Sequence, residues 1–571
     1  MRILKPISIA FIATLTLVSC GTSKTTTTTT TSTATNTVKE ITIITATDSI
    51  RPKTGKMTEA QIQAWPHMDV FTDSVPGMSL DKAYAFVKDK QGTTVIVAVI
   101  DSGIDIEHED LKDVVWVNTN EIAGNNKDDD NNGYVDDING WNFLGGKAGQ
   151  STPEQLELTR IVKKMMPRFD GKSEADIAEA DKADFKLFTE LKSTIDKKLI
   201  TAKNTVEQYT SYKQAITIAK DTLTKILAGK ELNLENINAT KFDDPALQQG
   251  KMILMQIVSS GSNADEAEKE LDGAIKHFQN QLDSQYKIDF NGRLTNDNPD
   301  DITDTSYGNG FVIGSKDDEM HGTHVSGIIA AKRNNGIGMN GVAHNVKIMC
   351  VRAVPDGDEY DKDVALAIRY AADNGAKVVN MSFGKGHSPN AEWVYDAIKY
   401  AEEKDVLLVH AAGNDAANFD IEANFPNDSK DKLIEFSDNV LTVGAMTRHF
   451  DDKLVASFSN YGIKNVDIFA PGLEIYSTVP KNEYESIQGT SMAAPEVVGV
   501  AALIRSYYPK LTASQVKHII MDSGIEYKKQ VIKPGSNHEN SEKVSFDTLS
   551  VSGRILNAYN ALVMADKMSK E

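Results

Sequence analysis

The chain of 571 residues has very little cysteine, no long apolar segment in its interior and a deficit of positive charge. Its two cysteines, Cys20 and Cys350, cannot form a disulfide framework. No internal stretch reaches about 18 consecutive apolar residues, which excludes a protein with several membrane spans. Asp and Glu number 81 against 61 Lys and Arg, and the net charge of −20 argues against nucleic acid as a partner.

The composition is otherwise that of a folded protein. Hydrophobic residues make up 40% of the chain and charged residues 25%, so a sizeable core can form and global disorder is excluded. The length exceeds that of one ordinary domain and predicts about two to four modules.

The first residues predict an export signal. A positively charged start precedes an apolar run over 7–18, which is too short to span a membrane comfortably. The residues before Cys20 resemble a bacterial lipobox, which implies that Cys20 carries acyl chains and anchors the protein in a membrane. A plain secretory signal with an incidental cysteine is the alternative. We predict a signal peptide over 1–19, a threonine-rich tether over 20–60, and an exported lipoprotein of the cell envelope, on its periplasmic face or at the cell surface.

Residues 61–150 and 291–571 alternate short β-branched runs with helical patterns. Strand-like runs occur at 95–100, 346–351, 378–381, 406–411 and 440–443, and helical patterns at 363–374 and 391–403. This alternation predicts one split α/β domain with a doubly wound parallel sheet and helices on both faces. In such sheets, functional sites form at the carboxyl ends of the strands.

Residues 151–290, between these two parts, differ in composition and in the spacing of their apolar residues. Glycine is sparse, and apolar residues from Ile195 to Leu227 recur mostly at steps of three and four residues, as they do again from Ala267 to Leu282. This spacing predicts an all-α helical insertion whose helices pack on each other. The insertion is either a decoration without chemistry or a gate or docking arm.

Three separated motifs carry residues suited to acyl transfer. Asp101 ends an apolar strand, His321 opens the motif HGTHVSG, and Ser491 lies in GTSMAAP at a helix start. Each alone has an ordinary explanation, as a strand-end carboxylate, a metal-binding histidine pair or a helix cap. Together they supply a nucleophile, a base for its proton and a carboxylate that orients the base, in the chain order Asp, His, Ser.

In these motifs the chain resembles the subtilases, the subtilisin-like serine proteases, over roughly residues 78–564 apart from the insertion. The resemblance implies a subtilisin-like fold and a serine endopeptidase that acts on protein or peptide substrates. It also implies that Ser491 is the nucleophile, that His321 is the general base and then the acid, and that Asp101 orients the imidazole.

Further segments extend the resemblance. Residues 409–414 look like the oxyanion segment of the family, so that Asn414 would donate its side-chain amide to the developing oxyanion. The resemblance implies that substrate binds along Ser382, Phe383 and Gly384 at the cleft edge and along Ala411, Ala412 and Gly413 in the primary specificity pocket. The rival interpretation is an inactive binding or scaffold protein that keeps the fold. The presence of all four catalytic groups favours the enzyme.

An acidic loop at 128–137 places five carboxylates in ten residues. Its spacing fits the start of a calcium loop, D-x-[DN]-x-[DN]-G, but position twelve is Asn139, so the loop is not an EF-hand. A solvated acidic turn is the alternative. The predicted oxygen ligands of a structural Ca²⁺ are Asp128, Asp130, Asn132, the Tyr134 carbonyl and Asp136.

Overall fold

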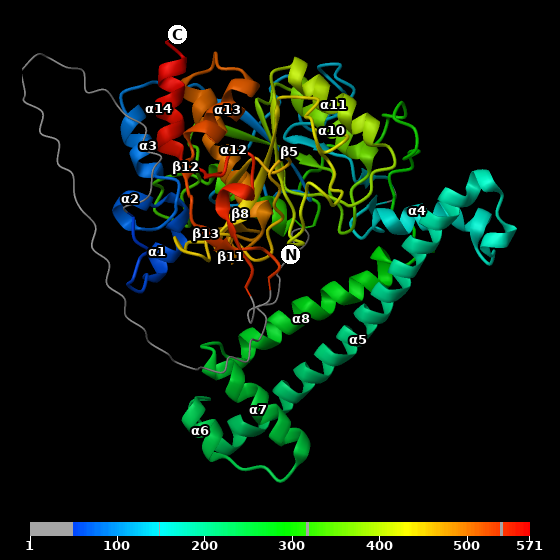
Figure 1. The fold of residues 1–571 in the computed structure, drawn as a ribbon, viewed down its shortest axis with the longest axis vertical. Coiled ribbons are helices and arrows are strands. Elements are labelled where there is room, and N and C mark those ends of the chain that lie inside the picture. Colours follow the sequence, from blue (N-terminus) through cyan, green and yellow to red (C-terminus); the bar gives the residue numbers. More distant parts are fainter. Residues whose placement is uncertain (1–49, 148, 316–318, 537–540, 571) are drawn as a thin grey trace, which may run out of the picture.

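The computed structural model describes residues 50–147, 149–315, 319–536 and 541–570 (Figure 1). The predicted signal peptide, the lipidation at Cys20 and the first part of the predicted tether lie outside these residues. None of the helices in the described part of the chain has both the length and the apolarity that crossing a bilayer demands.

A nine-stranded sheet forms the centre of the protein. In spatial order its strands are β12 (Ile525–Glu526), β15 (Arg554–Ile555), β9 (Ile468–Pro471), β8 (Val440–Met446), β7 (Leu407–Ala411), β6 (Val378–Met381), β1 (Val95–Asp101), β5 (Val346–Arg352) and β2 (Gly140–Asn142). All neighbours pair in parallel except β12, which runs antiparallel to β15 at the edge. The predicted α/β class with a parallel sheet is therefore confirmed.

Helices cover both faces of the sheet (Figure 1). One face packs on α10 (Asp361–Asp373) and α11 (Ala391–Glu403), and the other on α3 (Leu80–Val87), α9 (Met320–Ala330), α12 (Thr490–Tyr507), α13 (Ala513–Ser523) and α14 (Ala558–Met568). The position of β1 between two hydrophobic cores explains its apolar sequence. Val97 and Val99 point into one core, and Ala98 and Ile100 point into the other. A strand buried on both faces reads as a continuous hydrophobic run.

Smaller elements complete the domain. They are α1 (Glu59–Gln63), α2 (Val70–Asp73), the hairpin of β10 (Ile475–Val479) and β11 (Glu483–Ile487), and the short pairs β3 (Gly145–Gly146) with β4 (Gly149–Gln150) and β13 (Gln530–Ile532) with β14 (Lys543–Ser545). The β10–β11 hairpin leads directly into α12, which begins beside the carboxyl ends of the central strands.

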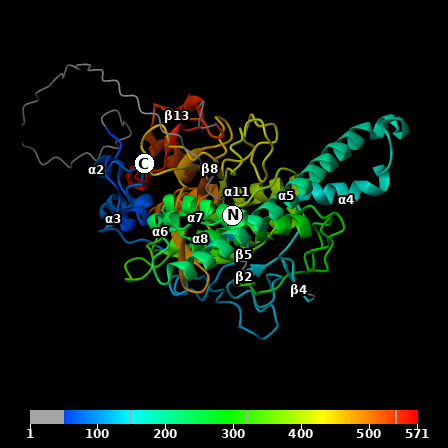
Figure 2. The same cartoon turned by 90° about the horizontal axis from the view of Figure 1, so that it is seen from below.

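The predicted insertion is all-α. It contains α4 (Glu157–Phe169), α5 (Lys182–Leu227), α6 (Leu234–Ala239), α7 (Pro245–Ser259) and α8 (Ala264–Asn280). We call residues 182–280, which comprise α5 to α8, the helical arm. Its longest helix, α5, has 46 residues and is therefore about 69 Å long. The arm projects beneath the α/β domain (Figures 1 and 2).

The insertion has two hydrophobic clusters of its own. The cluster near the base joins α4 with the start of α5 and includes Val162, Phe169, Phe188 and Ile195. The distal cluster joins α5, α6 and α7 with the start of α8. These contacts account for the apolar stripe in the sequence, because the helices bury it mainly against one another.

Buried charges anchor the entry of the insertion in the α/β domain. Glu157 and Arg160 of α4 pair at 2.5 Å, and Lys385 lies 2.8 Å from Glu157. All three side chains are buried. Burial would raise the pKa of Glu157, but Arg160 and Lys385 lower it to about 2, so its charge persists.

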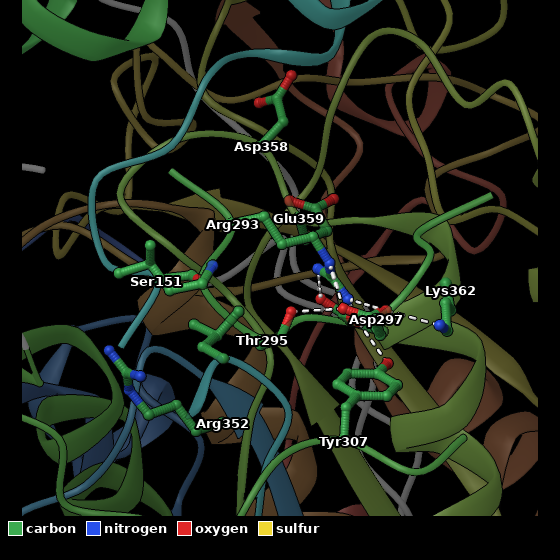
Figure 3. Close-up of polar contacts among 12 residues, drawn as sticks. Ser151, Arg293, Thr295, Asp297, Tyr307, Arg352, Asp358, Glu359 and Lys362 are labelled. Carbon is green, nitrogen blue, oxygen red and sulfur yellow. Dashed lines mark hydrogen bonds and ion pairs between the residues drawn. The ribbon is translucent and has the colours of Figure 1, made fainter. Parts of the chain in front are cut away.

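The exit of the insertion is anchored in the same way. Figure 3 shows Asp297 between Arg293 and Lys362, with contacts of 2.7 and 2.6 Å. Arg293 also forms two hydrogen bonds of 2.9 Å with Asp363, in the first turn of α10. Although burial would raise the pKa of Asp297, these cations lower it to about 2. The predicted segment 151–290 therefore begins inside the packed domain, and the part that projects is smaller.

We expect the arm to be separable from the domain. Tyr209 of α5 packs against Phe278 of α8, with ring centroids 6.1 Å apart. A Gly/Ser linker of about four residues can therefore join these two positions and replace 210–277. The cluster near the base and the buried ion pairs remain. Thermal unfolding should therefore show a folded protein whose melting temperature lies within a few degrees of the full-length value.

The matched control is deletion of all of 151–290. This removes Glu157 and Arg160 and leaves Lys385 buried without one of its two carboxylate partners, and breaking a buried pair costs about 3–5 kcal/mol. We expect this variant to be insoluble or unfolded. Equal stability of the two deletions would contradict the assigned boundary.

Candidate active site

A buried carboxylate and a histidine meet at the end of β1. Asp101 is the last residue of the strand and its side chain is 2% exposed, whereas His321 lies in the first turn of α9 and is 26% exposed. Asp101 Oδ1 lies 2.8 Å from His321 Nδ1 and also accepts the Ser102 N–H at 2.7 Å. A carboxylate can only accept, so Nδ1 carries the proton and Nε2 is left as the basic nitrogen.

Close backbone contact makes this pairing possible. A Cβ atom on Gly322 would lie 2.2 Å from the Gly103 carbonyl oxygen and 3.2 Å from Asp101 Oδ1. Any other residue at this position would push the start of α9 away from β1. The glycine after the histidine therefore sets the distance between His321 and Asp101.

Ser491 is the second residue of α12 and lies opposite the end of β6. Its hydroxyl donates to the Ser382 carbonyl oxygen at 3.2 Å, and the Ser382 hydroxyl donates to the Ser491 carbonyl at 2.9 Å. The Asn380 side chain donates to the Ser382 hydroxyl and holds it in place. The Ser491 hydroxyl is thus turned toward Ser382 rather than toward His321. Catalytic hydrogen bonds commonly form only when substrate is bound.

The orientation of the Asn414 amide follows from its partners. Asn414 Oδ1 accepts the Thr490 N–H at 2.9 Å and the Thr490 hydroxyl at 3.1 Å. A backbone N–H can only donate, so the side-chain oxygen must face Thr490 and the NH₂ group must point away from it. Asn414 is exposed, and its NH₂ group is a donor beside the start of α12.

The cleft edge follows β6. Ser382 comes directly after the strand, and the Phe383 carbonyl accepts a hydrogen bond of 2.9 Å from His410 Nε2. His410 is fully buried, and burial lowers its pKa to about 4, so the ring is neutral with the proton on Nε2. A Cβ atom on Gly384 would lie 2.8 Å from Asn424 Oδ1, which keeps this edge free of a side chain.

The predicted specificity pocket follows β7. Ala411 and Ala412 are buried and present mainly backbone. The Ala412 carbonyl accepts hydrogen bonds from the side chains of Asn424 and Asn460 at 3.0 and 2.9 Å. A Cβ atom on Gly413 would lie 2.4 Å from Asn460 Nδ2. The carboxyl ends of β6 and β7 therefore form two adjacent segments with little side-chain bulk.

The sequence motifs did not reveal the roles of His410 and Thr490. Thr490 accepts the Gly413 N–H at 3.0 Å while it holds Asn414, so it links the two segments beside Ser491. The only indication of this role in the sequence was the position of Thr490 immediately before Ser491. His410 precedes the small residues at 411–413, but a histidine in an apolar strand indicates no partner by itself.

Two carboxylates of the acidic loop form a group with a third from outside it. Single oxygen atoms of Glu121, Asp128 and Asp130 lie within 4.8 Å of one another. An all-oxygen set of this kind suits a hard cation such as Ca²⁺. Glu121 lies seven residues before Asp128, outside the spacing of the motif, and the sequence did not indicate it. The structure brings Asp128 and Asp130 together as expected from the loop.

Of the other predicted ligands, Asn132 lies beside the carboxylate group, because its side-chain NH₂ donates to Asp130 Oδ2 at 3.3 Å. Asp136 accepts the backbone N–H groups of Gly124, Asn125 and Asn126 at 2.9 to 3.2 Å, and the structure does not bring it to the carboxylate group. Asn132 Oδ1 accepts the Tyr134 N–H at 2.8 Å, so this oxygen stabilises the turn. No contact defines a role for the Tyr134 carbonyl in the described part of the chain.

Comparison with known families gives one match to a family model. The model described as the Subtilase family matches residues 92–542, which is most of the chain. The match covers β1, α9 and α12 with Asp101, His321 and Ser491.

Individual relatives are proteases. A thermophilic serine proteinase of Bacillus sp. (strain AK1) is 44% identical over 189 residues, which is 33% of this chain and 42% of that protein. The cell wall-associated protease of Bacillus subtilis (strain 168) is 40% identical over 220 residues, 38% of this chain and 23% of that protein. Subtilisin DY of Bacillus licheniformis is 37% identical over 37% of this chain and 73% of its own length. The chain thus spans less than half of the first two relatives.

Among solved structures, a protease from Pseudoalteromonas arctica aligns over 88% of this chain and 97% of its own, with 19% identity and a TM-score of 0.41.

The buried histidines predict how stability depends on pH. Burial lowers the pKa of His410 to about 4 and that of His324 to about 3. Below the ordinary value of about 6.5, the unfolded chain therefore binds protons that the folded chain does not. Stability must fall as the pH is lowered from about 6.5 toward 4, by about 2 kcal/mol for His410 at pH 5.

Urea denaturation of His410→Gln, in a Ser491→Ala background that prevents self-cleavage, tests this. Gln keeps a donor for the Phe383 carbonyl, so between pH 7.5 and 5 the variant should lose about 2 kcal/mol less than the parent. The control is His387→Gln, which changes a histidine outside the core. If the pH profiles of His410→Gln and the parent run parallel, His410 is not the titrating group.

Proposed function

The chain belongs to the subtilase family, and we propose that it is a serine endopeptidase that hydrolyses peptide bonds through Asp101, His321 and Ser491. The observation that carries the proposal is the 2.8 Å contact between the buried Asp101 carboxylate and His321 Nδ1. It leaves Nε2 as the basic nitrogen of a side chain that is 26% exposed. A histidine oriented by a buried carboxylate is the arrangement that activates a serine hydroxyl.

The reaction follows from these groups. His321 Nε2 takes the proton of the Ser491 hydroxyl as Oγ attacks the substrate carbonyl carbon. The negative charge on the carbonyl oxygen is stabilised by the Asn414 NH₂ group and the Ser491 backbone N–H. His321 then gives its proton to the leaving amine, and water hydrolyses the acyl-enzyme by the same steps in reverse. Asp101 stabilises the imidazolium without taking the proton.

Substrate binding would release the Ser491 hydroxyl from the Ser382 carbonyl. An extended peptide pairs with exposed backbone through N–H and carbonyl groups. A substrate N–H that donates to the Ser382 carbonyl would compete with the Ser491 hydroxyl, which occupies this oxygen at 3.2 Å. A rotation about χ1 then frees the hydroxyl to turn toward His321. Substrate itself would complete the site.

The rival proposal is an inactive binding protein with the same fold. The four chemical groups that the reaction needs are all present at 101, 321, 414 and 491, and Asn414 is held with its donor exposed. An inactive protein has no need to orient this amide or to bury a carboxylate behind the histidine, so we favour the enzyme.

We further propose that the enzyme is exported and anchored to a lipid membrane through acylated Cys20, at the cell envelope. The support is the sequence alone: the charged start, the short apolar run and the residues before Cys20. Its partners would be protein or peptide substrates. The net charge of −20 disfavours nucleic acid.

We also propose a structural Ca²⁺ held by Glu121, Asp128 and Asp130. The support is the approach of their oxygen atoms to within 4.8 Å and the chemistry of the donor set. The neighbouring Asp137 is buried and accepts the Tyr370 hydroxyl at 2.7 Å, which ties the loop to α10. An ion at this place would stabilise the fold and take no part in the proton transfers.

The catalytic proposal predicts the result of a single substitution. Ser491→Ala should abolish peptide hydrolysis to near background, and His321→Ala should do so to a similar extent, because the groups act as a unit. A fluorophosphonate should label the parent at Ser491 and leave Ser491→Ala unlabelled. If pure Ser491→Ala kept most of the activity, the assignment would be wrong.

The calcium proposal predicts the melting temperature. At a hundredfold excess over the Kd, a bound ion adds about 2.7 kcal/mol, so a chelator should lower the melting temperature of Ser491→Ala. Glu121→Gln and Asp128→Asn should lower it similarly and remove the response to the chelator.

Asp136→Asn is the matched control for this experiment. It weakens hydrogen bonds to the turn at 124–126, so it should lower the melting temperature while the response to calcium remains. Equal melting curves with calcium and with chelator, together with no metal in the purified protein, would refute the site.

A further inference from the structure

The insertion contacts the α/β domain beside the cleft edge. Lys385 follows Gly384 directly, and its ammonium group lies 2.8 Å from both Glu157 of α4 and Asp361 of α10. Lys385 also donates to the Glu359 carbonyl at 2.7 Å. These side chains are buried, so the base of the insertion is rigidly attached at one end of the segment that begins with Ser382.

The helical arm also contacts the hairpin that leads into Ser491. Lys269 of α8 lies 3.6 Å from Glu485 of β11, and both side chains are at least partly exposed. Strand β11 ends at Ile487 and runs within a few residues into Ser491. The Glu485 carbonyl lies 3.1 Å from His324 Nε2, which connects the hairpin to α9, the helix that carries His321.

Ser491 is therefore linked to both contacts of the insertion. On one side it bonds to Ser382, three residues before Lys385, and on the other it follows the hairpin that meets Lys269. Figure 1 shows α8 running beneath the domain from the side of α4 toward β11, and Figure 2 shows the arm across the same face from below. At the end of α8 the Asn280 side chain donates a hydrogen bond of 2.6 Å to Asp356, and from Asn280 to Lys269 the helix covers about 17 Å.

We infer that the helical arm is a bridge over the catalytic cleft that admits an extended polypeptide and excludes folded proteins. The substrates would be unfolded or unstructured polypeptides, which deepens the proposed function and rests on it. The stretch of about 17 Å between the two attachments of α8 equals the length of about five residues of extended chain at about 3.3 Å each. A small folded domain is about 30 Å across, which exceeds this stretch.

The two attachments of the bridge differ in strength. The ion pairs at the base are buried, whereas the Lys269–Glu485 pair is exposed, with Lys269 71% accessible. Exposed pairs of this kind contribute little to stability. The end near β11 can therefore open to release or admit a chain, while the base remains attached.

The test uses one cleavable sequence in three contexts: a short peptide, a surface loop of a stable folded carrier, and the same carrier made permanently unfolded. The parent should cleave the peptide and the unfolded carrier with kcat/KM values within about tenfold of each other, and the folded carrier at least a hundredfold more slowly. Replacing 210–277 by the short Gly/Ser linker removes Lys269 and should raise kcat/KM for the folded carrier at least tenfold. The kcat/KM for the peptide should stay unchanged.

A single substitution tests the end near β11 without a deletion. Lys269→Glu places like charges together and should raise the ratio of folded-carrier to peptide cleavage two- to fivefold. The control is Lys276→Glu, the same change of charge at an exposed lysine of the same helix, which should leave the ratio unchanged.

Two results would overturn the inference. If the shortened arm leaves the ratio of folded-carrier to peptide cleavage as in the parent, the arm does not limit access. If the shortened arm loses cleavage of the unfolded carrier but keeps that of the peptide, the arm recruits substrate and does not exclude it. Absence of peptide cleavage by the parent, equal to that of Ser491→Ala, would instead contradict the proposed function itself.

Discussion

The contact between the Asp101 carboxylate and His321 constrains the rest of the site. A carboxylate that is almost fully buried must be hydrogen-bonded, and Asp101 satisfies this through the Ser102 N–H and His321 Nδ1. The bond in turn requires α9 to start against the end of β1, which only a glycine at 322 permits. Once α9 is placed, His324 fixes the β10–β11 hairpin, and this hairpin leads to Ser491.

The same site is built from residues separated by a long insertion. Asp101 and His321 are 220 positions apart in the chain, yet they lie 2.8 Å apart. The insertion is compatible with this because both of its ends are attached by buried ion pairs near α10, through Glu157 on entry and Arg293 on exit. The two halves of the α/β domain can therefore pack as if they were continuous. The helical arm projects from this attached base and meets the β10–β11 hairpin through Lys269.

Much of the fold could be predicted because its signals are local. The apolar runs of β1 and β5 and the periodic stripe of α5 appear directly in the sequence, and the motifs around His321 and Ser491 are continuous. Contacts between distant segments have no such signal. The approach of Glu121 to the acidic loop, the contact of Lys269 with Glu485 and the direction of the Ser491 hydroxyl depend on how elements pack. Asp136 illustrates the limit, since its spacing suits a metal ligand but the group of neighbouring carboxylates contains Glu121, Asp128 and Asp130 and not Asp136.

The most direct test of the account is the protonation of His321 observed by ¹⁵N NMR in the Ser491→Ala protein at a pH where the ring is neutral. With Asp101 as the acceptor, the proton must lie on Nδ1. In Asp101→Asn the amide can donate to Nδ1, so the proton should move to Nε2, and in the otherwise native enzyme this substitution should remove most of the activity. A neutral ring that carries its proton on Nε2 in the Ser491→Ala protein would contradict the role assigned to Asp101.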